Sequence, residues 1–128
     1  MLHHFVLWVP DLDRAEASWS WLLGLLGYEL DRGFGERLVF RHPEGFAVAL
    51  ESSADMVPGM LHSRMRPGLN HLAFRVDSAA RLATILDGAL DNGWSPLPGD
   101  RHPIAAGAVV AYLEDRDGFE VELVAPSD

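Results

Sequence analysis

Two histidines occur in short stretches of similar sequence, 67 positions apart. His4 lies in LHHFVLWV (Leu2–Val9) and His71 lies in LNHLAFRV (Leu69–Val76). A third side chain able to bind metal, Glu122, interrupts a mostly apolar run near the end of the chain. Two imidazoles and one carboxylate make the 2-His-1-carboxylate arrangement, which suits Fe, Mn, Ni or Zn and leaves coordination positions open to a substrate. We therefore expect these residues to hold one divalent metal ion.

The alternation of side chains along strands predicts where these three groups point. Successive side chains of a strand point to opposite faces of the sheet. Each histidine should therefore point away from a row of apolar residues on the same strand, and that row should face the helices. Glu122 is placed likewise on the final strand. The polar faces should then meet in one concavity. The three apolar rows are Phe5, Leu7 and Val9; Leu72, Phe74 and Val76; and Phe119, Val121 and Leu123.

The elements that follow each histidine strand also repeat. After the first comes an amphipathic pattern from Asp11 to Gly27, with Asp11 as the expected N-cap, and after the second a similar pattern ends at Gly93. In the second helix Asp77 or Ser78 caps the start. The apolar stripe there is Leu82, Ile85, Leu86, Ala89 and Leu90, and three short strands near Tyr28–Arg32, Arg37–Arg41 and Phe46–Glu51 complete the first half.

The closing strands extend the correspondence between the halves. PEGFAVALES (Pro43–Ser52) aligns with RDGFEVELVA (Arg116–Ala125) through Gly-Phe, the following Val and a later Leu. We interpret the chain as an α+β protein with two tandem β-α-β-β-β modules, residues 1–53 and 68–128, joined by a linker at 54–67. Together the modules should form a curved, partly open mixed sheet with helices outside and a concave cleft.

Composition narrows the classes of partner. The net charge is −9, with 10 basic and 19 acidic residues and an isoelectric point near 4.9, which argues against nucleic acid or an anionic membrane as a partner. The absence of cysteine leaves His and carboxylate side chains as the available strong metal ligands. No apolar run approaches the roughly 20 residues that a membrane span requires, so a cytoplasmic protein is the expectation.

Three stretches, LHHFVLWVPDLDRA, GLNHLAFRV and YLEDRDGFEVELVAP, closely resemble the vicinal oxygen chelate superfamily, which includes glyoxalase I, extradiol dioxygenases, fosfomycin-resistance and bleomycin-resistance proteins. The resemblance covers almost all of residues 1–128 as a single domain. It implies metal ligands at His4, His71 and Glu122. Four-ligand members add a glutamate late in the first module, where this chain has Ala49. Glu51, two residues on, could be that fourth ligand or a general base.

Other residues are candidates for contact with a substrate. Arg75 shares the face of its strand with His71 and could bind an anion, although a structural ion pair with Glu120 or Glu122 is the alternative. Trp8 could line an aromatic wall of the pocket, although a core role is the alternative. His102 lies in a loop that could fold over the pocket and move protons. His42 and His62 are interpreted as ordinary loop histidines.

Two functions from different classes follow from these observations. The first is a metal-dependent enzyme of the glyoxalase type, a lyase, isomerase or dioxygenase, acting on a small oxygen-rich substrate that chelates the metal. The second is a metal-free protein that sequesters a small molecule, as the resemblance to bleomycin-resistance proteins allows. The resemblance also implies a homodimer, in which the modules pair within one chain or exchange between two.

Overall fold

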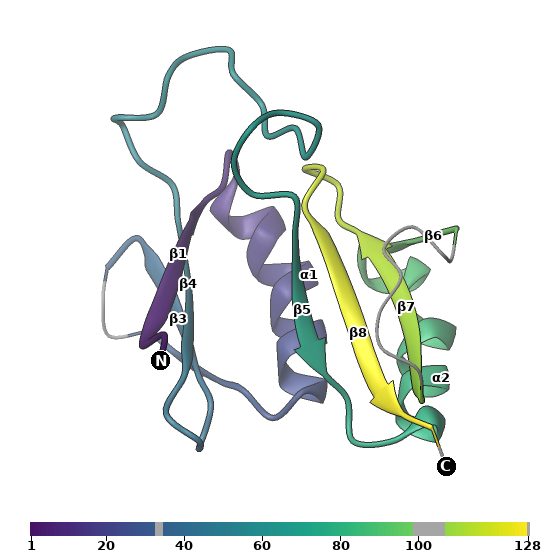
Figure 1. Cartoon of the computed structure of the whole chain (residues 1–128). Coiled ribbons are helices and arrows are strands. Elements are labelled where there is room, and N and C mark those ends of the chain that lie inside the picture. Colours follow the sequence, from purple (N-terminus) through teal and green to yellow (C-terminus); the bar gives the residue numbers. More distant parts are fainter. Residues whose placement is uncertain (33–34, 99–106, 128) are drawn as a thin grey trace. The chain divides into compact units, whose positions relative to one another are not determined.

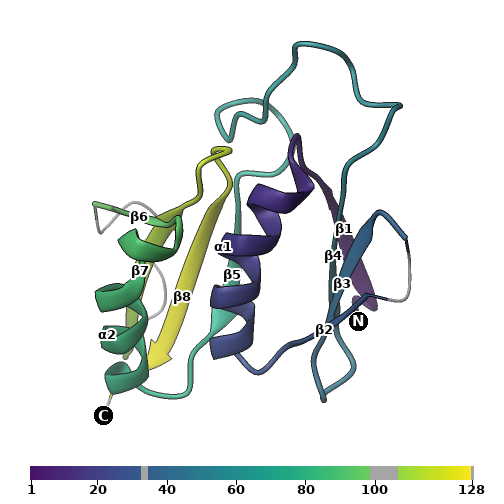
Figure 2. The same ribbon diagram turned by 180° about the vertical axis from the view of Figure 1, so that it is seen from behind.

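The computed structural model describes residues 1–32, 35–98 and 107–127, and the chain divides into two compact units, residues 1–61 and 62–128. Each unit is a β-α-β-β-β module with one four-stranded sheet, shown from two sides in Figures 1 and 2. Residues 52–70 contain no helix or strand. The prediction of an α+β protein built from two tandem modules is confirmed. Each sheet is mixed and open.

The two sheets have the same topology. The strand order is β1-β4-β3-β2 in the first unit and β5-β8-β7-β6 in the second, and in each the first strand runs parallel to the last while the remaining pairs are antiparallel. The first unit contains β1 (His4–Trp8), α1 (Leu12–Leu25), β2 (Glu29–Asp31), β3 (Arg37–Arg41) and β4 (Ala47–Glu51). The second contains β5 (His71–Arg75), α2 (Ala79–Gly88), the 3-10 turn η1 (Leu90–Asn92), β6 (Ser95–Leu97), β7 (Ala108–Glu114) and β8 (Glu120–Pro126).

Both helices begin at a side-chain cap. Oδ1 of Asp11 accepts a hydrogen bond from the backbone N–H of Arg14 at 3.0 Å, and Oγ of Ser78 accepts one from Arg81 at 3.1 Å. Of the two caps expected for the second helix, Ser78 is therefore the one used. Each such bond satisfies a backbone donor that the first turn leaves without a partner.

The second helix is shorter than its apolar pattern predicts. α2 ends at Gly88, and the chain continues as a 3-10 turn to Gly93, which has a left-handed backbone with φ of 87°. The tighter turn changes the angular spacing of side chains. As a result Leu90 is 70% exposed, and the prediction that it belongs to the buried stripe was wrong.

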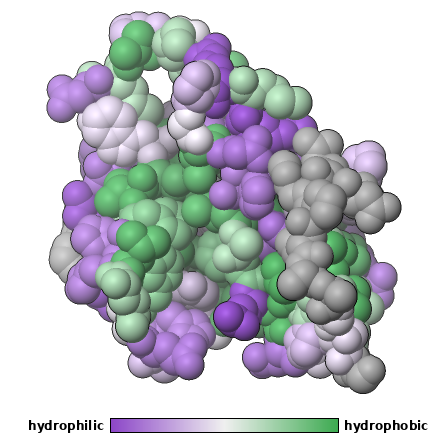
Figure 3. All heavy atoms as spheres, viewed as in Figure 1, coloured by the Kyte–Doolittle hydropathy of each residue, from purple (hydrophilic) through white to green (hydrophobic). Residues whose placement is uncertain are grey.

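The alternation predicted for the first strand is observed. His4, Val6 and Trp8 are exposed, whereas Leu7 and the following Val9 are buried. The buried row packs in a core with α1, whose Trp19 is fully buried; truncating such a side chain to Ala costs about 3–5 kcal/mol. The opposite face of the sheet therefore carries the exposed side chains of this strand. Figure 3 shows hydrophobic residues gathered over the first sheet, with hydrophilic residues around them.

None of the helices in residues 1–32, 35–98 and 107–127 is both long and apolar enough to cross a membrane.

Candidate functional site

His71 and Glu122, predicted to bind one metal ion, meet in the second unit. β5 pairs with β8 so that Ala73 lies beside Glu122, and Nε2 of His71 lies 3.1 Å from Oε2 of Glu122. Glu122 is only 3% exposed, and the hydroxyl of Tyr112 donates to its other oxygen, Oε1, at 3.4 Å. A carboxylate so buried requires compensating partners. The structure supplies an imidazole and a phenol.

The residue before His71 determines which ring nitrogen carries a proton. The side-chain N–H of Asn70 donates to the backbone carbonyl of Arg64 at 3.0 Å, so the amide oxygen of Asn70 faces the other way, 2.7 Å from Nδ1 of His71. That oxygen can only accept, so Nδ1 of His71 donates. In a neutral ring, Nε2 then presents a lone pair to the carboxylate of Glu122. Two acceptors that face each other require a cation between them, either a proton or a metal ion.

A second buried carboxylate, Glu120, lies next to this pair. It is 2% exposed, and its Oε2 is 3.8 Å from Nδ1 of His71. Its Oε1 lies 3.9 Å from Nε of Arg64, whose NH1 is 2.5 Å from Glu114. Arg64 therefore neutralises part of the negative charge on this face. The alternative role of Arg75, an ion pair with Glu120 or Glu122, is not observed among the described residues.

His4 occupies the corresponding position on the first strand. Its side chain is exposed, and its Nδ1 lies 2.8 Å from Nδ1 of the preceding residue, His3. His3 and Asn70 thus take equivalent positions in the repeat and contact the same atom of the following histidine. When His4 is the donor in this contact, its Nε2 is left as the atom available to a metal ion.

Glu51 and Trp8 are in direct contact. The indole N–H of Trp8 donates to Oε1 of Glu51 at 2.8 Å, and Nε of Arg37 donates to Oε2 at 2.6 Å. These hydrogen bonds, from Trp8 first and then Arg37, lower the pKa of the Glu51 carboxyl group. Glu51 is therefore held as an anion, which suits a metal ligand or an anchor for Arg37 better than a general base. Trp8 is 44% exposed, not a core residue.

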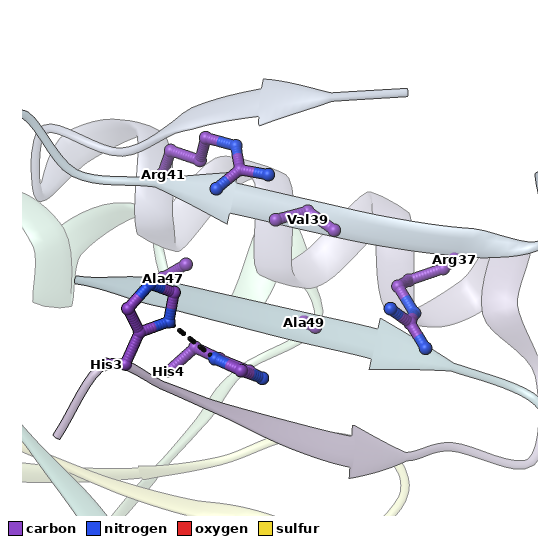
Figure 4. Close-up of a pocket in the computed structure, with 7 residues that line it drawn as sticks. All are labelled: His3, His4, Arg37, Val39, Arg41, Ala47 and Ala49. Atoms are coloured by element: carbon purple, nitrogen blue, oxygen red, sulfur yellow. Dashed lines mark hydrogen bonds between the residues drawn. The ribbon is translucent and has the colours of Figure 1, made fainter. Parts of the chain in front are cut away.

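A pocket of about 150 Å³ opens on this face of the first sheet (Figure 4). Its floor is small and apolar, and its rim consists of nitrogen-bearing side chains. Figure 4 shows Arg37 and Arg41 on β3, on either side of Val39, with the two histidines beyond Ala47. The lining residues are His3, His4, Arg37, Val39, Arg41, Ala47 and Ala49.

Comparison with known proteins agrees with the duplicated fold. The family model for the Glyoxalase/Bleomycin resistance protein/Dioxygenase superfamily matches residues 3–112. The chain belongs to this superfamily. YqjT, an uncharacterized Bacillus subtilis protein, is 33% identical to this superfamily member over 98% of this chain and 99% of its own.

Solved structures of the superfamily resemble this chain over nearly its full length. A provisionally named glyoxalase from Bacillus halodurans is 33% identical and superposes with a TM-score of 0.85, covering 98% of this chain and 96% of its own. The fosfomycin resistance protein FosX from Listeria monocytogenes has the same fold at 19% identity, with a TM-score of 0.69 over 99% and 91% of the two chains. The superfamily includes enzymes, and divalent metals are common among its members.

Two of the three residues predicted to bind a metal ion lie together in the second unit. His71 and Glu122 fit a metal site: two donors about 2.1 Å from one ion and at about 90° to each other are roughly 3.0 Å apart, close to the observed 3.1 Å. Over residues 1–32, 35–98 and 107–127, however, the structure brings together no group of three or more His, Asp or Glu side chains that could hold a metal ion. His4 belongs to the other unit.

The other residues predicted to contact a substrate lie away from the His71–Glu122 contact or outside the described residues. His102 lies outside the described residues. Arg75 is exposed at the end of β5, beside Val124. Trp94 is fully buried in the core.

His62 is not an ordinary loop histidine. Its ring stacks on Phe119 with centroids 4.2 Å apart and planes 12° from parallel. Burial lowers the pKa of His62, and the charges of Arg64 and Arg66 lower it further.

The sequence analysis missed the roles of Arg64 and His62, and those of His3 and Asn70, the two residues that contact Nδ1 of His4 and His71. Arg64 and His62 lie in the aperiodic stretch between the modules, where no pattern predicts a contact. The signal for His3 and Asn70 was present: a polar residue precedes the histidine in both copies of the repeated strand.

Proposed function

We propose that this protein is a metal-dependent enzyme in which His4, His71 and Glu122 bind one Fe, Mn, Ni or Zn ion and a small oxygen-rich substrate occupies the adjacent face. The observation that supports this most directly is the distance of 3.1 Å between Nε2 of His71 and Oε2 of Glu122, with Nδ1 of His71 held by the amide oxygen of Asn70. When bound, the ion supplies Lewis-acid stabilisation of negative charge on substrate oxygens, as in glyoxalase-type lyases, isomerases and dioxygenases.

The protein's own residues have separate roles in this proposal. Asn70 and His3 orient the ligand histidines through Nδ1, and Tyr112 holds the second oxygen of Glu122. Glu51, kept ionised by Trp8 and Arg37, is available as a fourth ligand. Trp8, Arg75 and His102 remain the candidates for substrate contact and proton transfer.

In a homodimer, His4 could come from the same chain as His71 or from a second copy. If it comes from a second copy, metal binding depends on dimerisation. Size-exclusion chromatography of the His4→Ala variant, with and without metal, distinguishes these arrangements. Mixing His4→Ala with His71→Ala restores some metal sites if the ligands come from two chains.

A second candidate function is metal-free sequestration of a small molecule. It is favoured by the pocket in the first unit, whose lining residues include arginines and histidines but no Asp or Glu. Elemental analysis of untagged protein, followed by calorimetric titration with Zn²⁺, Ni²⁺ and Mn²⁺, separates the two. The enzyme proposal expects about one metal per site, lost in His71→Ala and Glu122→Gln; failure to bind any of these metals, or Fe²⁺ under anaerobic conditions, supports sequestration.

A further inference from the structure

The two sheets share one strand register but carry opposite charges at equivalent positions. In the first, Ala47 on β4 lies between His4 and Arg41. In the second, the corresponding residue is Glu120, which lies between His71 and Glu114. At this position of the shared register, the first sheet therefore has Arg41 and the second has Glu114. Ala49 and Val39 correspond likewise to Glu122 and Tyr112.

These exchanges explain why the first sheet has a pocket at this place. Ala47 and Ala49 have side chains of one carbon, where the second sheet has two glutamates, and Val39 replaces the much larger Tyr112. The three small residues form a buried apolar cluster that is the floor of the pocket. Its volume of about 150 Å³ is similar to that of an apolar cavity that accepts benzene. A ligand group of a few heavy atoms fits.

The rim of the pocket provides hydrogen-bond donors and positive charge. Arg37 and Arg41 are the charged residues that line it, and no Asp or Glu is among its lining residues. Each guanidinium is held by a carboxylate outside the pocket: Nε of Arg37 contacts Glu51 at 2.6 Å, and Nε of Arg41 contacts Asp31 at 3.4 Å. Anchoring through Nε orients the planar fork before a ligand arrives, which reduces the entropic cost of binding.

We propose that this pocket binds the oxyanion of a small organic acid, a carboxylate or a phosphonate, with the short apolar body of the acid lying on Val39, Ala47 and Ala49. The arginines select for negative charge and the floor limits the size of the body. The inference rests on the proposed function only in identifying this acid as the substrate. The binding itself needs no metal, and it occurs despite the overall charge of −9, which would repel anions from most of the surface.

The test is a calorimetric or ligand-observed NMR titration of protein stripped with EDTA. The probes are propionate and ethylphosphonate, with uncharged propionamide as the neutral control. We expect the two anions to bind about tenfold more tightly than propionamide, the effect of one charge-assisted contact. The stronger of the two anions identifies the acid group. Equal binding of all three probes, or no binding, overturns the proposal.

Variants localise the binding. Arg41→Gln should weaken the anions about tenfold, while Arg81→Gln, which removes the same charge from an exposed position on α2, leaves them unchanged. Ala49→Leu fills the floor and should abolish binding, with circular dichroism and thermal unfolding confirming the fold. Unchanged affinity in folded Arg41→Gln overturns the assignment to this pocket.

The same titration on His71→Ala separates this inference from the proposed function. Anion binding retained in His71→Ala, together with a failure to bind metal in the wild type, supports the pocket and contradicts the metal enzyme. Anion binding that requires added metal and is lost in His71→Ala contradicts the pocket and supports the metal site.

Discussion

The amide oxygen of Asn70 lies 2.7 Å from Nδ1 of His71, and this contact sets the ring so that Nε2 faces Glu122. Asn70 is itself fixed by its bond to the backbone carbonyl of Arg64. The ring of His71 is therefore oriented by a short segment that contains no helix or strand.

Replacing Asn70 tests that orientation. Asn70→Leu removes the acceptor for Nδ1, and we expect metal affinity to fall about 10- to 100-fold, as is common when a ligand's outer partner is lost. Asn70→Asp keeps an acceptor and should retain most of the affinity. Nitrogen NMR shifts of the His71 ring should report the loss of the Nδ1–H tautomer in Asn70→Leu but not in Asn70→Asp. The prediction is contradicted if the leucine variant keeps both the tautomer and the affinity, and Asn92→Ser is the control for mutating an asparagine elsewhere.

Removing Arg64 should destabilise the second unit. Arg64 lies between Glu114 and the buried Glu120, so Arg64→Met leaves a carboxylate without its cation at a cost of about 2–4 kcal/mol. Urea denaturation measures the loss. Arg66→Met, at an exposed position two residues away, should change stability by less than about 0.5 kcal/mol. Adding Glu120→Gln to Arg64→Met should recover part of the loss, and a further loss would argue against this role for Arg64.

His62 should make stability depend on pH in mildly acidic solution. Its pKa in the folded protein is below the ordinary value of 6.5, chiefly because the ring is buried, so the unfolded chain binds the proton more readily. Stability contributed by the neutral ring is present above pH 6.5 and is lost as pH falls from there toward the folded pKa. His62→Phe, which keeps a ring to stack on Phe119, should flatten this part of the curve of unfolding free energy against pH. An unchanged slope in the variant would assign the pH dependence to another group.

Glu51 should limit how strongly Arg37 attracts an anion in the first-unit pocket. Glu51→Gln removes the charge that Arg37 now faces, so we expect propionate to bind about two- to threefold more tightly to the metal-free protein. Stability should change by less than about 1 kcal/mol, because both side chains are partly exposed. Glu36→Gln, the loss of a charge at an exposed position nearby, measures the effect of net charge alone. Weaker propionate binding in Glu51→Gln would show that Glu51 matters mainly by positioning Arg37.

The features predicted from the sequence are those set by periodicity and by the repeat. Alternation placed His4 opposite Leu7, and the register of the repeat predicted that Glu122 and Ala49 occupy equivalent positions, as the strand pairing shows. Both depend on local geometry that the sequence pattern encodes directly.

Contacts made by irregular segments could not be predicted in this way. Arg64 reaches Glu114 and Glu120 across about 50 positions of sequence, and no spacing rule relates them. The pocket likewise depends on the lack of large side chains at the positions that form its floor. Ala47 and Ala49 carry no chemical signal of their own, and their role is evident only once Arg37 and Arg41 are seen beside them.

The matching registers of the two sheets also have an evolutionary consequence. Two of the four alanine codons, GCA and GCG, differ from a glutamate codon by a single nucleotide, so an exchange of alanine for glutamate at these positions can require as little as one base change. A duplicated gene could thus exchange a sheet face with small apolar residues for one with acidic residues, or the reverse, without altering the backbone. Diversification within this superfamily would then require few mutations, because the scaffold already aligns the positions at which they act.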